Sequence, residues 1–174
     1  KINLGLDLQG GSYLLLEIDN APVIEQKLQN LTTTIRNYFK NKDIKINNIK
    51  IENQNIFFNV LEENKQSIID TFNDENSNIN PYYPRFKSHQ LEIEDTGLNF
   101  KISFSKQGLI ALKTSSQDQA IEIVRRRIDE LGTNEPNIMK RGNNRILVEL
   151  PGLDDPNRIK TLLGKTANLT FQFI

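Results

Sequence analysis

Residues 137–150 read NIMKRGNNRILVEL, and this stretch predicts a β-hairpin. Its second arm, 145–150, carries the apolar and β-branched residues that are typical of a strand. Gly142 and the two Asn residues after it are typical of a turn between two strands. We therefore expect antiparallel strands at 137–141 and 145–150, with the apolar face turned towards a core.

A helix is expected on each side of this hairpin. The helix before it carries one apolar face, formed by Ile121, Val124, Ile128 and Leu131. Gly132 follows at the position where a glycine commonly ends a helix. The helix after the hairpin has Asp155 as its cap, Pro156 at its first position and Gly164 at its end. A last strand is expected at 168–174.

The N-terminal residues predict the strand that completes this half of the chain. Residues 13–18 read as a buried strand, and Gly10 and Gly11 before it indicate a bend or bulge. If this strand pairs with the second half, the order of elements becomes βαββαβ, the ferredoxin-like arrangement. Asn20 can then cap a helix whose apolar stripe is Ile24, Leu28, Leu31, Ile35 and Tyr38.

The middle of the chain predicts a second set of strands and helices. Strands are expected at 45–51, 56–61, 86–94 and 98–104, with a short helix around Ile68 and Phe72. A weak internal repeat has an offset of about 90 residues. It places Ile56 and Val60 opposite Ile146 and Leu150. This similarity suggests two modules of one pattern, although α+β sequences also share such patterns by chance.

These elements predict an α+β fold in two parts. The first part is a ferredoxin-like βαββαβ base with an antiparallel sheet, formed by 1–19 and 106–174. The second part is an inserted α+β module of similar pattern, formed by 20–105. The alternating strands indicate that helices cover one face of each sheet.

Composition excludes several classes of function. Twenty-two Lys and Arg balance twenty-two Asp and Glu, which argues against nucleic acid as a partner. The chain has no Cys, so disulfides and cysteine nucleophiles are excluded. With a single His, a structural zinc site is nearly excluded. We expect no catalytic residues, no cofactor and no bound metal.

The ends of the chain are strand-like, and no apolar run is long enough to span a bilayer. We therefore expect a piece of a longer protein whose targeting or membrane segments lie outside it.

Individual candidates for a site have plain structural explanations. Asp7 lies beside the glycine pair, where its carboxylate can cap local N–H groups or shape a docking loop. The three residues 125–127 are all Arg, but consecutive helical residues point about 100° apart and form no single basic face. We expect nearby carboxylates to pair with much of that charge. His89 has no second imidazole, and Tyr82 with Tyr83 can either contact an extended chain or pack on the module's core.

Two blocks of sequence resemble the SecD family of bacterial protein-export subunits. The first is LGLDLQGG at 4–11, which is similar to the family's LGLDLxGG signature. The second runs from IVRRRIDELG at 123–132 through Glu135, Pro136 and RILVELPGL at 145–153 to LG at 163–164 and LTF at 169–171. The matching positions are Leu4, Gly5, Leu6, Asp7, Leu8, Gly10, Gly11, Arg126, Arg127, Leu131, Gly132, Glu135, Pro136, Glu149, Leu150, Pro151 and Gly152.

This resemblance implies a non-enzymatic role in export. SecD works in the bacterial inner membrane with SecF, beside the SecYEG channel, and helps preproteins move by using the proton-motive force. The chain resembles the first extracytoplasmic, periplasmic domain of a membrane-embedded parent, without most or all of its mobile head. The signature residues are then structural or contact a partner. A ligand-binding regulatory domain is the alternative, because ferredoxin-like folds often bind small molecules.

Overall fold

The computed structural model describes residues 6–7, 11–130, 136–151, 161, 163 and 171–173. The chain divides into two compact units. Unit 1 comprises Lys1–Asn20 and Lys113–Ile174, and unit 2 comprises Ala21–Leu112. The division predicted from the sequence, 1–19 with 106–174 against 20–105, stays a prediction.

Unit 1 is built on an antiparallel sheet centred on two strands from opposite ends of the chain. Strand β2 (Gly11–Ile18) pairs with β10 (Arg145–Pro151), and β10 also pairs with β9 (Asn137–Arg141). The predicted hairpin is therefore confirmed. On the other edge of β2, β1 (Leu6–Asp7) pairs with its beginning and β11 (Phe171–Phe173) with its end.

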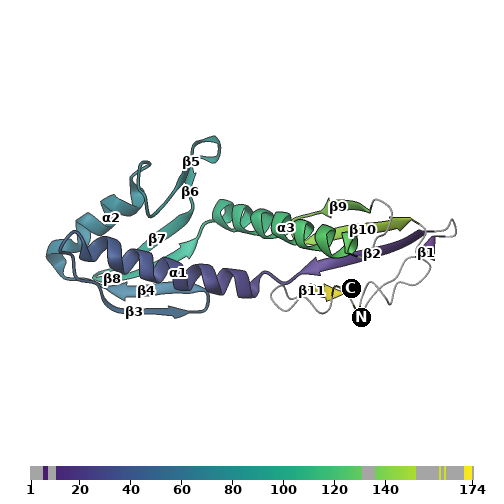
Figure 1. The fold of residues 1–174 in the computed structure, drawn as a ribbon. Coiled ribbons are helices and arrows are strands. Elements are labelled where there is room, and N and C mark those ends of the chain that lie inside the picture. Colours follow the sequence, from purple (N-terminus) through teal and green to yellow (C-terminus); the bar gives the residue numbers. More distant parts are fainter. Residues whose placement is uncertain are drawn as a thin grey trace. The chain divides into compact units, whose positions relative to one another are not determined.

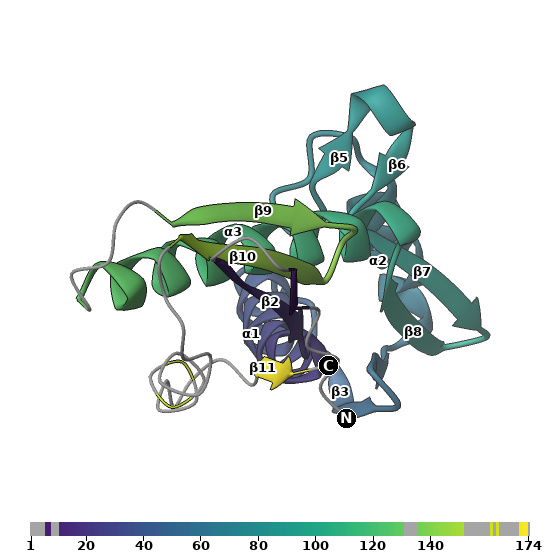
Figure 2. The same cartoon turned by 90° about the vertical axis from the view of Figure 1, so that its right-hand side faces the viewer.

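Helix α3 (Lys106–Asp129) runs along one face of this sheet (Figures 1 and 2). Every second side chain of β2 and β10 is buried, because alternate residues of a strand point to the same face. The core joins these side chains to α3; its members include Leu14, Leu16, Ile18, Ala120, Val124, Ile128, Ile146, Val148 and Leu150. The apolar stripe predicted from the sequence thus faces the sheet at Val124 and Ile128.

Unit 2 has its own four-stranded antiparallel sheet, in the order β3-β4-β8-β7. Its strands are β3 (Asn47–Glu52), β4 (Asn55–Asn59), β7 (Leu91–Thr96) and β8 (Asn99–Phe104). Helices α1 (Ala21–Lys40) and α2 (Lys65–Asn73) lie on one face of the sheet (Figure 1). Aromatic rings fill much of this core: Phe58 stacks on Phe100, and Phe39 on Phe72.

Three sequence expectations for unit 2 are wrong in detail. The stripe of α1 ends at Phe39, which is fully buried, while Tyr38 packs at the margin. Asn20 does not cap α1: its amide donates to the Ile18 carbonyl, and Oδ1 has no hydrogen-bond partner among the described residues.

The third error concerns the strand expected at 86–94, which is split. A two-stranded hairpin joins β5 (Tyr82–Tyr83) to β6 (Ser88–His89) through a 3₁₀ turn, Pro84–Phe86, and β7 begins only at Leu91. Proline at the first position of the turn and a left-handed Lys87 reverse the chain there.

The fold is α+β with antiparallel sheets, as predicted. Its exact ferredoxin-like order is not confirmed, because the second helix of the base is expected at 155–164, where only 161 and 163 are described. Among the described strands, the order along the sheet of unit 1 is β9-β10-β2, and β1 and β11 both pair with the outer edge of β2.

Candidate functional site

The two signature blocks meet in the sheet of unit 1. In β1, Leu6 lies opposite Ser12 and Asp7 lies opposite Gly11. On its other side, Gly11 lies opposite Pro151 of β10. The blocks are more than 100 residues apart in the sequence, yet their strands are neighbours. Leu4, Gly5, Leu8 and Gly10 lie outside the described residues.

The Glu149 side chain, on β10, makes hydrogen bonds to both neighbouring strands. One carboxylate oxygen accepts a hydrogen bond from the Tyr13 hydroxyl at 3.0 Å, and the other accepts one from the Asn137 amide at 3.2 Å. Tyr13 belongs to β2 and Asn137 to β9, so the carboxylate bridges both neighbours of β10. Leu150, the next residue, points the other way into the core and is fully buried. Both residues therefore have clear structural roles.

The arginine run is only partly paired. Arg127 contacts Glu130 one turn later, with 3.3 Å between Nη1 and Oε2. Arg125 and Arg126 are exposed and form no ion pair with the described residues. Asp118, one of the nearby carboxylates on α3, pairs with Lys140 of β9 and not with an arginine of the run. The arginines thus leave accessible positive charge on α3, but at exposed positions that point in different directions.

For the side chains of two more signature residues, both prolines, the structure gives only the degree of burial. Pro136 is half-buried just before β9, and Pro151 is exposed at the end of β10. Leu131, Gly132, Glu135 and Gly152 lie outside the described residues.

Gln117 is a structural residue that the sequence reading missed. Its side chain is only 2% exposed, and Nε2 donates to the carbonyl oxygens of Gly142 and Arg145, at 3.1 and 2.7 Å. It thereby holds the β9–β10 turn against α3. A signal was present: Gln117 lies four residues before Ile121, on the extension of the helix's apolar stripe, where a polar side chain needs a buried partner.

Asn80 plays the corresponding part in unit 2. Its amide group donates to the carbonyl oxygens of Phe72 and Leu91, at 2.7 and 3.1 Å, and its side-chain oxygen accepts from the Leu91 N–H at 2.8 Å. The side chain joins α2 to β7 across the loop between them. No sequence signal marked Asn80, because it lies in a polar stretch that resembles a solvated loop.

His89 and the tyrosine pair belong to this structural network. The His89 ring lies 4.8 Å from the Tyr82 ring, and its Nδ1 is 3.1 Å from the Asn80 carbonyl oxygen. Desolvation is the main cause that raises the pKa of Tyr82, and the nearby Glu75 carboxylate adds to it. Burial raises the pKa of Tyr83. Both tyrosines are half-buried. Tyr82 packs on the His89 ring of its own module, and neither tyrosine is among the side chains that pack on the described core of unit 2.

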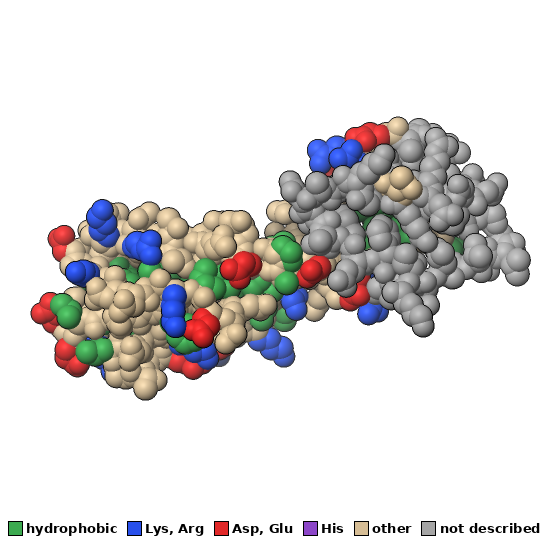
Figure 3. Space-filling view, turned by 90° about the horizontal axis from the view of Figure 1, so that it is seen from below, with side chains coloured by type: hydrophobic (Ala, Val, Ile, Leu, Met, Phe, Trp, Pro, Cys, Tyr) green, Lys and Arg blue, Asp and Glu red, His purple; other side chains and the backbone are tan. Residues whose placement is uncertain are grey.

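Within the described part of the chain, no group of three or more His, Cys, Asp or Glu side chains is placed to hold a metal ion. No helix in that part has the length and apolar character that crossing a membrane requires. On the face of unit 2 in Figure 3, basic and acidic side chains are interspersed, with no continuous basic surface.

Two family models match the ends of the chain. The model described as the SecD/SecF GG motif matches 1–22, and that of the N-terminal part of the P1 domain of protein translocase subunit SecDF matches 117–174. No solved structure gives a significant match.

Curated relatives match the whole chain. Protein translocase subunit SecD of Rickettsia bellii is 36% identical over 174 residues, and that of Acetobacter pasteurianus is 34% identical over 176. SecD of Desulfurispirillum indicum is 31% identical over 175 residues. Each match covers 100% of this chain and 32 or 33% of the relative, so the chain spans about a third of their length. The match includes 20–105, where no signature is visible.

Proposed function

Since the chain belongs to the SecD family of protein translocase subunits, we propose that it is a periplasmic domain assisting preprotein export across the inner membrane. The parent subunit works with SecF beside the SecYEG channel and draws on the proton-motive force. The domain catalyses no reaction. Its task is mechanical: a packed α+β base supports the parts of the subunit that engage the moving preprotein.

The observation that carries this proposal is the pairing of β2 with β10. Both family matches, 1–22 and 117–174, contribute a strand to one sheet, and the two strands pair over seven residues. Of the signature residues on these strands, Leu150 is buried in the core and the Glu149 carboxylate bonds to both neighbouring strands. This arrangement supports a scaffold role, because these two residues join the strands to one another and to the core.

Disrupting the core of this base in the full-length subunit tests the role in export. Ile128 is 0% exposed between α3 and the sheet, so Ile128→Asp buries an unpaired charge and costs about 4 kcal/mol or more. In a strain depleted of its own SecD, we expect the variant to leave preproteins unprocessed in a pulse-chase experiment. Gln119→Asp, at an exposed position of the same helix, is the matched control and supports normal maturation.

Immunoblots of the membrane fraction accompany this assay. Normal maturation with Ile128→Asp present at the normal level contradicts the proposal. Failure of the Gln119→Asp control at normal abundance contradicts the scaffold role, because that substitution leaves the core intact.

A further inference from the structure

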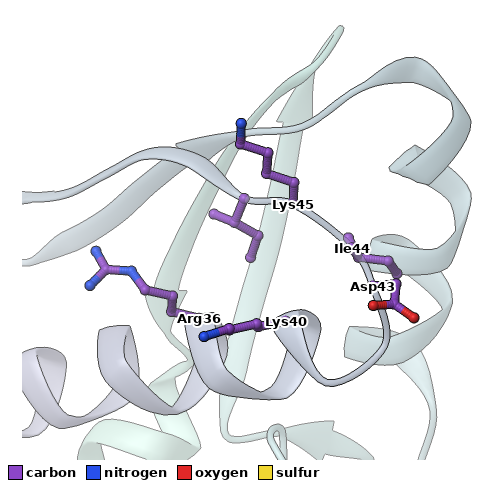
Figure 4. A pocket seen from close by; sticks show the side chains of 6 residues that line it. Arg36, Lys40, Asp43, Ile44 and Lys45 are labelled. Carbon is purple, nitrogen blue, oxygen red and sulfur yellow. The ribbon is translucent and has the colours of Figure 1, made fainter.

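A surface pocket of about 310 Å³ lies in unit 2, where α1 ends and the chain turns towards β3. Its lining combines basic and apolar side chains: Arg36, Lys40, Asp43, Ile44, Lys45 and Ile46. The two isoleucines are the half-buried apolar part of the lining, while the charged side chains, labelled in Figure 4, are exposed. The pocket belongs to the central part of the chain, for which the sequence suggested no function.

The three cations of this pocket are not neutralised. None of Arg36, Lys40 and Lys45 forms an ion pair with a described residue, whereas Lys50, Lys65, Lys101 and Lys140 all do. In Figure 4 the Asp43 carboxylate lies on the opposite side of the pocket from the Arg36 guanidinium. Arg36 and Lys40 are also four residues apart on α1, a spacing at which like charges repel. The pocket therefore has a net positive rim, with three cations and one carboxylate.

The arrangement does not suit a compact anion such as phosphate. The Lys45 ammonium points away from α1, on another side of the pocket from Arg36 and Lys40, so the cations surround the rim and do not converge (Figure 4). The neighbouring end of α1 is its C-terminus, where the helix dipole is negative. Separate carboxylates on a flexible segment can reach the individual cations, while an apolar residue between them contacts the isoleucines.

Strand pairing contributes little to recognition here. Strand β3 is an edge strand and begins directly after the pocket, so an extended chain has an open edge beside it. The register of β3 shifts between Asn47 and Lys50, and Asn48 has a positive φ of 51°. Such irregularities turn an edge away from strand addition. Side-chain contacts in the pocket must therefore supply most of the affinity.

We propose that this pocket is a docking site for an extended polypeptide segment in which acidic residues flank apolar ones. The carboxylates pair with Arg36, Lys40 and Lys45, and an apolar side chain packs on Ile44 and Ile46. This inference goes beyond the proposed role in export, because it concerns unit 2 alone and holds or fails independently of that role.

Fluorescence anisotropy with the 174-residue chain tests the proposal. The probe is a short labelled peptide in which Glu and Leu alternate, and its matched control has Gln in place of Glu. We expect the acidic peptide to bind at least about tenfold more tightly. Its affinity falls as salt is raised, since exposed charges are screened within about 10 Å at 0.1 M. Equal binding of the two peptides overturns the proposal.

Charge reversal locates the site. The triple variant R36E/K40E/K45E should weaken binding of the acidic peptide about tenfold or more, as expected when three favourable charges become repulsive. The matched control is K27E/R85E/K106E, which changes the net charge equally at exposed positions of the same unit. If both triple variants weaken binding equally, only the net charge matters and the pocket assignment is wrong.

Two further measurements keep the test decisive. Lys40 in the last turn of α1 also stabilises the helix dipole, so melting temperatures are compared. If the triple variant is unstable, Lys45→Gln outside the helix replaces it and should weaken binding by a few-fold. Displacement of the peptide by inorganic phosphate at matched ionic strength indicates a compact-anion site and overturns the peptide assignment.

Discussion

The two units build sheets of the same strand order from different chain orders. Along the sheets, β9-β10-β2-β11 of unit 1 corresponds to β3-β4-β8-β7 of unit 2 once the short strand β1, which shares the outer edge of β2 with β11, is set aside; all neighbours are antiparallel. The inner neighbour of β10 is β2, the first long strand of the chain. The inner neighbour of β4 is β8, the last strand of its unit. Moving the first strand to the end converts one order of strands into the other.

This comparison explains why the internal repeat is weak. The repeat aligned Ile56 with Ile146, and these residues lie in the corresponding strands β4 and β10. A single offset cannot also align β2 with β8, because one precedes and the other follows the shared elements. Strand order therefore depends on which apolar faces fit together and not on the order in which the chain supplies them.

The units also differ in how a buried side-chain amide bonds to the backbone of a loop or turn. Asn80 lies in a loop and uses both its amide hydrogens and its oxygen, whereas Gln117 lies on a helix and only donates. Buried backbone groups that lose their partner are costly, so the number of bonds made by each amide predicts the order of effects. Asn80→Ala and Gln117→Ala test this ranking, and Gly108→Ala tests a close backbone contact in unit 2.

Asn80→Ala is expected to have the largest effect, a loss of about 4 kcal/mol in the free energy of unfolding. It removes three hydrogen bonds from a side chain that is 1% exposed. Hydrogen exchange measured by mass spectrometry should accelerate in α2 and β7. If unit 1 exchanges equally faster, the two units unfold together and the comparison of independent units is wrong.

Gly108→Ala is expected to cost about 3 kcal/mol by overpacking. An added Cβ would lie 2.1 Å from the backbone oxygen of Gln90, an oxygen that accepts the Ser105 N–H. Gly142→Ala in unit 1 is the contrasting control: it meets no atom within 4 Å, and its φ of 61° costs only about 1 kcal/mol. Urea denaturation followed by circular dichroism measures both. If both variants lose the same free energy of unfolding, the backbone at Gln90 moves to make room for the added Cβ, and the overpacking prediction is wrong.

Gln117→Ala should have the smallest effect of the three, about 2 kcal/mol, because two carbonyl oxygens lose one donor group. Exchange should accelerate mainly at the β9–β10 turn. A loss as large as that of Asn80→Ala would contradict the ranking by number of bonds. Gln117→Glu is a second test, because it keeps the shape of the side chain and removes the amide N–H donors that bond to the two carbonyl oxygens.

Local periodicity was enough to predict most elements. The hairpin at 137–150, the buried face of α3 and the stripe of α1 follow from apolar spacing, because burial of one face imposes the period of a helix or strand. The error at Tyr38 is a shift of one position, within the apolar arc that a helix can present. The signature blocks identified the family, since their residue types and order are specific over both ends of the chain.

Contacts between distant residues were decided only by the tertiary structure. Nothing in the local sequence distinguishes Asn80, which is buried, from the solvated polar residues before it. The same holds for Gly108, whose small size matters because the Gln90 carbonyl approaches it. The free positive charge of the pocket at the end of α1 also follows from the fold, because no described carboxylate lies close enough to pair with Arg36, Lys40 or Lys45. The sequence alone determined the elements and the family, because both depend on short-range patterns. The pairing of β2 with β10 and the bonds of Gln117 join segments far apart in the chain, and the burial of Asn80 and the unpaired cations depend on how the chain packs around them.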